Sequence, residues 1–450
     1  MRLTTSLHCA AALLGFTLAT APGAAQAADD AHCHLGAYRD PAGHLMALTA
    51  ADGKALRFYL LDGRSGLLTP ATSGEGTTYT AGPGWSESAP TIATARLGAC
   101  NAETIEFDLK DGPSGQWQRV PLHVQAVHFQ SGGVSLAATW VEPAGQQPAP
   151  GVVFVHGSGA TASIDVVPWQ WLLPAEGISM LVFDKRGTGA SPGEFTQNFE
   201  TLATDVVAAA AAARRVGGKR LTRLGLAGFS QGGWVAPLAA TRAAVDFVIV
   251  GYGVVGSPVE QDVWQVSYQL QSQGFGADVL AKARRVTAAT GEFVASGYLT
   301  GLEKVRALQK EYAGEPWLSK IDGQYSGEIL RGEIQRAKEE SPGVIWNYDA
   351  AAVLRSVKVP QLWMMAAADS VAPSAPSIER LRKLQSEHVP IDLAIFPDTD
   401  HGLGNFRTLP DGKRQRTRLA DGYFPLQIDW VKGRLRPPYG RARLIPARAR

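Results

Sequence analysis

Residues 228–232, Gly-Phe-Ser-Gln-Gly, constrain the fold of this chain more than any other segment, because they lie between an apolar run typical of a strand and a run typical of a helix. A Gly-x-Ser-x-Gly turn from strand to helix is so tight that side chains on either side of the serine would clash. The same turn leaves the serine Oγ exposed above the sheet. The segment therefore predicts Ser230 as a nucleophile.

The same pattern occurs a second time, at residues 189–193 (GASPG). That match lies in a predicted loop, and Pro192 has no N–H to donate from the position where an oxyanion requires a donor. We therefore expect Ser230, and not Ser191, to be the nucleophile.

A serine nucleophile needs a base that takes its proton and a third group that orients the base. Of the nine histidines, only His388 and His401 follow Ser230, as a Ser, acid, His order along the chain requires. His388 ends a predicted helix, where a solvated histidine is expected. His401 lies just past the last predicted core strand, on a polar loop, and we predict it as the base.

The acid is expected on a loop after the preceding strand. Asp369 follows the apolar run LWMMAAA directly and precedes a loop rich in Ser and Pro, so we predict it as the group that holds the imidazole tautomer. Asp398 and Asp400 are alternatives because they are close to His401 in sequence, but neighbours on one short loop usually cannot reach Nδ1 of the ring.

The oxyanion of a tetrahedral intermediate needs preorganised N–H donors. Residues 156–159 (HGSG) follow a buried strand, and the backbone N–H groups of Ser158 and Gln231 are the predicted pair. An ordinary loop is the alternative, and a phosphate cradle is disfavoured because the segment lacks a P-loop lysine. In the dense motif that follows the next strand, FDKRGTGAS, we interpret Asp184 and Arg186 as mainly structural.

Three regions differ in their pattern. Residues 28–120 contain short β-like runs with hairpin signals at Asp-Gly pairs 52–53 and 62–63, which predicts a β-rich accessory domain. Residues 121–435 alternate strands with helices, which predicts an α/β core with a mostly parallel sheet. About residues 256–350 interrupt this alternation after the sixth core strand with a helical insertion rich in Trp and Tyr, predicted as a lid.

The two ends of the chain have their own composition. Residues 1–27 have an early Arg, an apolar stretch and a small-x-small end, which predicts a signal peptide and export to the periplasm or beyond. Residues 436–450 form an Arg-rich tail that either is solvated or touches anionic lipid or envelope polymer. Elsewhere no basic patch with interleaved aromatics occurs, which argues against nucleic acid as a partner.

After removal of the signal segment, Cys33 and Cys100 remain, and in an oxidising compartment they are expected to form a disulfide. The alternative, a metal fragment at residues 32–34 (HCH), lacks a second cluster with ligand spacing, so no metal site is predicted. With 45% hydrophobic and 19% charged residues, the 450-residue chain is typical of a globular protein and not of a disordered, fibrous or multi-pass membrane protein.

The motifs HGSG, FDKRGTGAS, GFSQGG, AAAD and DHG, in this order, resemble the α/β-hydrolase superfamily. The chain is most similar to secreted bacterial hydrolases of the dienelactone hydrolase-like and serine aminopeptidase-like groups. The resemblance covers roughly residues 127–435. It implies an eight-stranded, mostly parallel sheet with helices on both faces, a Ser230, Asp369 and His401 triad, an acyl-enzyme, and no cofactor.

Three functions remain open from the sequence. The first is hydrolysis of carboxylic esters or thioesters of small molecules. The second is a peptidase or amidase of the same fold, in which Glu339 and Glu340 could bind a substrate amino terminus. The third is a noncatalytic binding protein or an acyltransferase on this scaffold, which the intact motif set disfavours. The sequence leaves the oligomeric state unspecified.

Overall fold

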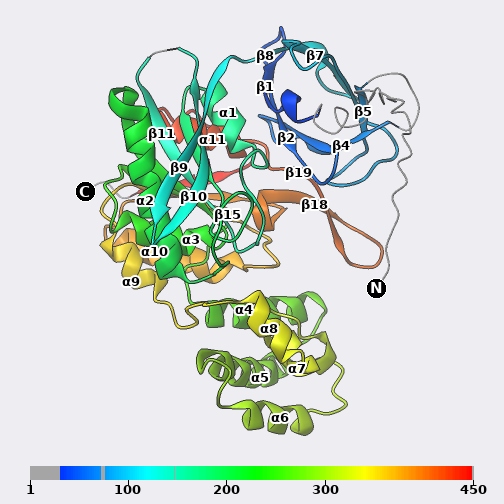
Figure 1. The fold of residues 1–450 in the computed structure, drawn as a ribbon. Helices are drawn as coiled ribbons and strands as arrows, with labels where there is room; N and C mark the ends of the chain where they lie inside the picture. Colours follow the sequence, from blue (N-terminus) through cyan, green and yellow to red (C-terminus); the bar gives the residue numbers. More distant parts are fainter. Residues whose placement is uncertain (1–30, 72–76, 146, 448–450) are drawn as a thin grey trace, which may run out of the picture.

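The computed structural model describes residues 31–71, 77–145 and 147–447. Figure 1 shows three parts: a β-barrel in blue, an α/β core, and a group of helices in green and yellow that extends from one end of the core. The predicted signal segment, residues 1–27, lies outside the described residues. Among the described helices, none is both long and apolar enough to cross a bilayer.

The N-terminal part is a closed antiparallel barrel of eight strands. These are β1 (Gly36–Arg39), β2 (Leu45–Ala50), β3 (Leu56–Leu60), β4 (Ser65–Pro70), β5 (Thr77–Ala81), β6 (Ala93–Leu97), β7 (Thr104–Leu109) and β8 (Ser114–Arg119). The predicted Asp-Gly turns join β2 to β3 and β3 to β4. Pairing of β1 with β8 closes the barrel, so each of its eight described strands has a partner on both sides.

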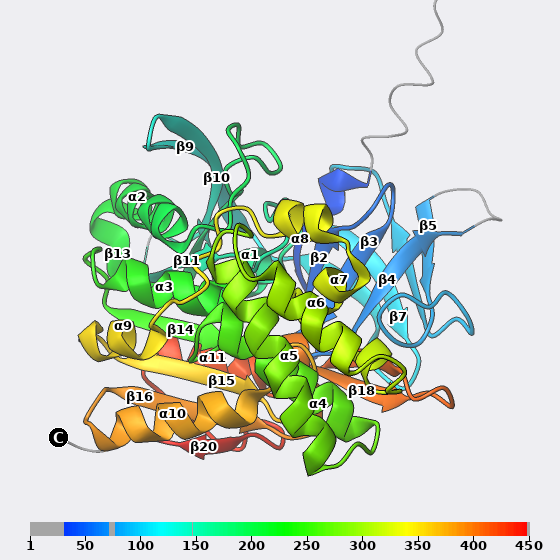
Figure 2. The ribbon, with the colours of Figure 1, turned by 90° about the horizontal axis from the view of Figure 1, so that it is seen from below.

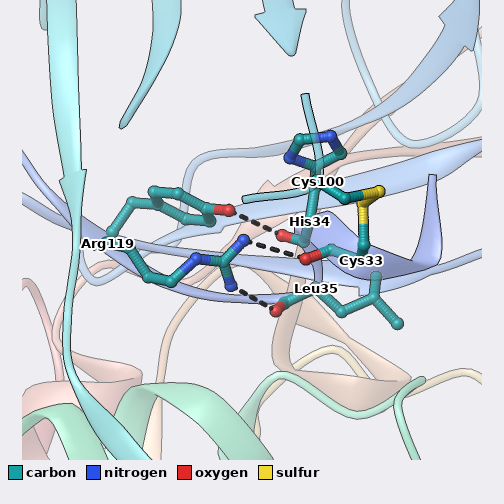
Figure 3. The surroundings of a disulfide bond; sticks show 6 residues. Cys33, His34, Leu35, Cys100 and Arg119 are labelled. Atoms are coloured by element: carbon teal, nitrogen blue, oxygen red, sulfur yellow. Dashed lines mark hydrogen bonds between the residues drawn. A yellow bond between two sulfur atoms is a disulfide. The ribbon is translucent and has the colours of Figure 1, made fainter. Parts of the chain in front are cut away.

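A disulfide joins Cys33 to Cys100, as predicted, with Cα atoms 5.4 Å apart. Cys33 lies in the short 3-10 helix η2 (His32–His34) that precedes the barrel. Arg119 of β8 donates to the carbonyl oxygens of Cys33 and Leu35, both at 2.9 Å (Figure 3). The disulfide uses both sulfur atoms, which leaves no thiolate for the alternative metal site at residues 32–34.

The core is a nine-stranded sheet in the order β20-β16-β15-β14-β13-β11-β12-β10-β9. Its strands are β9 (Leu122–Ser131), β10 (Val134–Pro143), β11 (Ala149–Val155), β12 (Ser179–Phe183), β13 (Leu221–Phe229), β14 (Phe247–Gly251), β15 (Gln361–Ala366), β16 (Ile391–Phe396) and β20 (Arg443–Ile445). The six strands from β11 to β16 in this list are parallel, and β9, β10 and β20 are antiparallel to their neighbours.

The ninth strand corrects two expectations, the eight-stranded sheet and a separate tail at residues 436–450. In the described part of this tail, β20 pairs with β16 and so covers the N–H and C=O groups of an otherwise open sheet edge. Gln385 donates to the carbonyl oxygen of Ile445 at 3.3 Å, and the N–H of Ala447 donates to Asp392 at 2.8 Å. The described part of the tail is therefore an element of the core.

Helices cover both faces of the sheet. One face packs against α2 (Phe199–Gly217), α3 (Gly232–Ala240), α9 (Ala350–Ser356) and α10 (Ser374–Ser386). The other face packs against α1 (Trp169–Ala175) and α11 (Tyr423–Val431), and the apolar cluster on this side continues into the interior of the barrel. The barrel and the core therefore share one hydrophobic core.

The insertion lies between β14 and β15. It consists of α4 (Pro258–Ser272), α5 (Ala277–Ala295), α6 (Leu302–Glu311), α7 (Ser326–Arg331) and α8 (Ile334–Glu340), and Figure 2 shows it from below. These helices have an apolar cluster of their own, which buries the aromatic side chains of Tyr312, Trp317 and Tyr325. Much of the aromatic content of the insertion is therefore ordinary core.

A small antiparallel sheet, β17 (Thr399–Asp400), β18 (Gly404–Thr408) and β19 (Arg414–Leu419), follows β16. It extends from the core toward the barrel, where the N–H of Leu419 donates to the carbonyl oxygen of Gly63 at 3.0 Å. This sheet therefore links the barrel to the loop that carries His401.

Candidate active site

Ser230 lies in the tight turn between β13 and α3, at a positive φ of 54°. This left-handed backbone conformation costs a non-glycine residue about 1–3 kcal/mol, and here a hydrogen bond of 3.0 Å from the Ser230 N–H to the carbonyl oxygen of Gly251 restrains it. The flanking glycines are required by space: a Cβ at Gly228 would lie 2.1 Å from the carbonyl oxygen of Gly232. The turn has the geometry that the sequence predicted.

The second Gly-x-Ser-x-Gly match has a structural role. Ser191 is buried, its hydroxyl donates to the carbonyl oxygen of Asp184 at 2.7 Å, and it accepts from the N–H of Ala137 at 2.9 Å. The Ser191 hydroxyl thus donates one hydrogen bond to the backbone and accepts another from it, so Ser191 is no nucleophile in this arrangement.

The structure brings Ser230, His401 and Asp369 together in one chain of hydrogen bonds. Nε2 of His401 lies 3.0 Å from Oγ of Ser230, and Nδ1 of the same ring lies 2.8 Å from Oδ2 of Asp369. Ser230 follows β13, Asp369 follows β15, and His401 directly follows the short strand β17. His388, the alternative histidine, is exposed just beyond the end of α10.

Asp369 is buried and held by backbone hydrogen bonds. It is 1% exposed, and its second oxygen accepts from the N–H groups of Val371 and Ala372 at 3.0 and 2.7 Å. These bonds fix the carboxylate so that the remaining oxygen faces the ring.

The rival acids have other partners. Asp400 accepts from the N–H groups of Ser370 and His401 and from Arg414. Burial acts to raise the pKa of Asp400, but the bonds from Arg414 and the backbone outweigh it and hold that pKa below its ordinary value. Asp398 is exposed and is paired with Arg441. Neither bonds to the His401 ring.

Tyr252 and Arg416 hold the His401 loop. The Tyr252 ring packs edge-on against the imidazole, with centroids 4.9 Å apart. Arg416 of β19 donates to the carbonyl oxygen of His401 at 2.5 Å, and its guanidinium also lies 4.8 Å from the centre of the Trp85 ring. Trp85 belongs to the barrel region, so the accessory domain contacts the histidine loop through one intermediary residue.

The two residues predicted as N–H donors lie at the same cavity as Ser230. Ser158 and Gln231 line the same cavity as Ser230 and His401. Gly157 is directly against Ser230, because a Cβ there would lie 3.6 Å from Cβ of Ser230. In the neighbouring motif, Asp184 accepts from three backbone N–H groups and Arg186 pairs with Asp205, which agrees with their interpretation as structural residues.

A cavity of about 360 Å³ opens above Ser230, between the core and the insertion. Its walls include apolar rings, four glutamines and two carboxylates from α7 and α8. The rings are those of Phe199, Trp234, Tyr325 and Trp346, and the glutamines are Gln197, Gln231, Gln261 and Gln324. The carboxylates belong to Glu328 and Glu340. Partial burial and the charge of Glu340 raise the pKa of Glu328, while Arg336 opposes this shift.

Comparison with known proteins agrees with this architecture. The model of the "Alpha/beta hydrolase family" matches residues 152–411, more than half of the chain. The chain belongs to this family. A search of curated proteins found no match to this chain.

Several solved structures are similar to the hydrolase. An acylaminoacyl peptidase of Pyrococcus horikoshii is 17% identical, with 84% of this chain and 54% of that chain covered and a TM-score of 0.41. An esterase of Pyrococcus furiosus is 16% identical, with 62% and 84% covered and a TM-score of 0.38. Est1E of Butyrivibrio proteoclasticus, solved with ferulic acid, is 18% identical, with 68% and 97% covered and a TM-score of 0.39. The chain thus spans about half the length of the acylaminoacyl peptidase.

Sequence reasoning missed several residues of this site. Tyr252 and Arg416 have no motif of their own, and only the fold brings them to His401. Of the pair Glu339 and Glu340, the structure places Glu340 in the cavity wall, whereas Glu339 is exposed and bonds to Gln335. Glu328 belongs to no motif; it lies on the short helix α7, and only the fold brings it to the cavity wall.

Proposed function

We propose that this chain is an exported serine hydrolase that cleaves carboxylic ester or thioester bonds through an acyl-enzyme on Ser230. The observation that carries the proposal is the continuous hydrogen-bond chain from Oγ of Ser230 through His401 to the buried Asp369. The aromatic part of the cavity wall suits an apolar acyl or alcohol group.

In this proposal, His401 accepts the proton of Ser230 through Nε2 as Oγ attacks the substrate carbonyl. Asp369 holds the Nδ1–H tautomer and stabilises the imidazolium that forms. The N–H groups of Ser158 and Gln231 donate to the oxyanion of the tetrahedral intermediate. His401 then protonates the leaving group, and a water molecule hydrolyses the acyl-enzyme along the same path.

Export is supported by two features. The residues before Asp29 have the composition of a cleavable signal, and the Cys33–Cys100 disulfide is of a kind that persists in oxidising compartments.

The kinetic test compares p-nitrophenyl butyrate, an ester, with alanine p-nitroanilide, an amide with a free amino group. We expect turnover of the ester to exceed turnover of the amide, and Ser230→Ala to abolish both. Faster turnover of the amide would contradict the proposed ester specificity and would indicate an amidase with the same mechanism.

Amide or peptide hydrolysis is a second candidate because Glu328 and Glu340 place two carboxylates in the wall of the cavity that contains Ser230. A free amino group of a substrate would pair with them. If this candidate is correct, Glu340→Gln raises KM for alanine p-nitroanilide about tenfold and leaves KM for p-nitrophenyl butyrate unchanged. The neighbouring Glu339→Gln is the matched control and changes neither. Equal effects of the two variants would contradict this candidate.

A further inference from the structure

Lys185 is a buried lysine near the nucleophile that the mechanism above does not use. It lies two residues beyond the end of β12 and is 2% exposed. Its Nζ donates to the carbonyl oxygen of Gly157 at 2.9 Å. Gly157 lies two residues beyond the end of β11, and β11 is the parallel neighbour of β12, so both residues emerge at the same edge of the sheet.

Among the described residues, the Lys185 ammonium group has no carboxylate partner. No ion pair of Lys185 occurs among residues 31–71, 77–145 and 147–447, whereas the next residue, Arg186, pairs with Asp205 at 2.5 Å. The Phe195 ring lies 4.9 Å from Nζ. Burial lowers the pKa of Lys185 to about 8, which reflects the cost of taking the charge out of water. A charge held at such a cost with only a carbonyl and a ring as partners points to a function.

The charged groups around Lys185 are otherwise engaged. Asp184 accepts from backbone N–H groups, and Asp205 is bound by Arg186. His156 stays neutral near pH 7, because burial and the Lys185 charge lower its pKa to about 3. The Gly157 carbonyl is therefore the group on which the Lys185 ammonium acts.

That carbonyl belongs to the same peptide unit as the N–H of Ser158. The peptide is not among the cis bonds of the described chain, and in a trans peptide the C=O and N–H point in opposite directions. A hydrogen bond to the Gly157 carbonyl oxygen therefore fixes the plane of this peptide, and with it the direction in which the Ser158 N–H points. It also polarises the amide, which strengthens its N–H as a donor. Ser158 lines the cavity together with Ser230.

We propose that Lys185 is a positioning residue for the oxyanion hole: through the Gly157 carbonyl it orients and polarises the peptide whose N–H, at Ser158, receives the oxyanion. This inference rests on the proposed serine hydrolase function. It assigns Lys185 a role only in the tetrahedral states, where charge develops on the substrate oxygen, so substrate binding itself depends little on the ammonium.

The test measures kcat and KM for p-nitrophenyl butyrate in Lys185→Met, which keeps the length of the side chain but removes charge and donor. We expect kcat to fall about 10- to 100-fold, less than the 10²–10³ typical for loss of a direct oxyanion donor, with KM within about twofold. Lys185→Arg, which can still donate to the carbonyl, is expected to recover most of kcat. Lys432→Met is the matched control, since Lys432 is partly buried at the end of α11, and we expect it to leave kcat unchanged.

The outcomes separate the two proposals. A wild-type protein with no esterase activity and no fluorophosphonate adduct contradicts the proposed function. An active wild type with kcat of Lys185→Met within twofold, or with the same loss in Lys432→Met, overturns the role of Lys185 alone.

If Lys185→Met does not fold, the pH profile gives the second measurement. The wild-type kcat is expected to fall above about pH 8, as the ammonium loses its proton. Lys185→Arg is expected to lack this alkaline fall, because guanidinium does not titrate there. The same fall in both proteins overturns the proposal.

Discussion

The assignment of the acid depends on the partners of three aspartates. Asp369 alone bonds to Nδ1 of His401, while Asp400 is saturated by Ser370, the His401 N–H and Arg414. We expect Asp369→Asn to lower kcat by about 10³- to 10⁴-fold, because the amide favours the wrong tautomer of the ring. Steady-state kinetics with p-nitrophenyl butyrate measures this. Asp400→Asn, the control, is expected to cost less than tenfold, and the reverse ranking would move the role to Asp400.

His156 makes the fold sensitive to acid. It is buried, and its Nε2–H donates to the carbonyl oxygen of Phe183. The unfolded chain takes up a proton on this ring near pH 6.5, whereas burial and Lys185 hold the folded pKa at about 3. The unfolded state therefore binds more protons between these values, and stability is lost as the pH falls through this window.

The pH range from 7 to 4 covers about 2.5 pKa units of that window, so at about 1.4 kcal/mol per unit we expect this group to remove on the order of 3 kcal/mol from the free energy of unfolding. Urea unfolding at pH 7 and pH 4 measures the loss. His156→Gln keeps a donor for the Phe183 carbonyl but does not titrate, so its loss should be smaller. An unchanged pH dependence in His156→Gln would show that other groups govern acid unfolding.

The three side chains of the hydrogen-bond chain could be predicted because each follows a recognisable strand in a fixed order along the chain. The role of Lys185 could not be predicted, because it depends on the carbonyl oxygen to which Nζ donates. That contact joins residues that follow two neighbouring parallel strands, and the sequence alone does not specify side-chain direction beyond a strand end.

The β18–β19 hairpin connects the barrel to the His401 loop. Gly402 and Gly404 leave room for the Arg416 side chain: a Cβ at either would lie 2.8 or 2.6 Å from it. The Arg416 guanidinium packs over Trp85, and Arg57 of β3 packs over the same ring at 4.1 Å. The accessory barrel therefore contacts and supports the loop that carries His401.

We expect Arg416→Met to lower kcat for p-nitrophenyl butyrate about tenfold, because the imidazole of His401 loses its fixed position. KM is expected to change little, because the substrate-binding cavity is unaltered. Arg407→Met is the matched control on the same hairpin, since Arg407 is exposed and pairs with Glu87. If both variants keep wild-type kcat, the hairpin has no part in positioning His401.

Element types were predicted more accurately than element ends. The long Ala-rich helix α2 begins at Phe199, and its cap is Asn198, which accepts from the Thr201 N–H. Several polar residues in a row offer equivalent caps, and tertiary packing of Phe199 selects among them. Strand β20 was missed for a similar reason, since three residues carry too little periodicity to compete with an Arg-rich composition.

The accessory domain and the core behave as one body in terms of packing. The barrel interior continues into the cluster under α1 and α11. Barrel closure could not be predicted, because it pairs Tyr38 of β1 with Arg119 of β8, residues distant in sequence that no local turn signal connects. The hairpins could be predicted, because each joins strands that are neighbours in sequence.

The disulfide is expected to stabilise the whole molecule through its unfolded state. It closes a loop of 67 residues, which corresponds to about 4 kcal/mol in the chain-entropy description. The double variant Cys33→Ser/Cys100→Ser is expected to lose stability of this order in urea unfolding, in one cooperative transition, with kcat unchanged at 25 °C. Two separate transitions would contradict a core shared by barrel and sheet.

The central claim is that Ser230 is the nucleophile. Intact-mass spectrometry after treatment with a fluorophosphonate tests it most directly. We predict one covalent adduct on the wild type and on Ser191→Ala, the control for the second Gly-x-Ser-x-Gly segment, and no adduct on Ser230→Ala. The absence of an adduct on the folded wild type, or an adduct that persists in Ser230→Ala, would contradict the account.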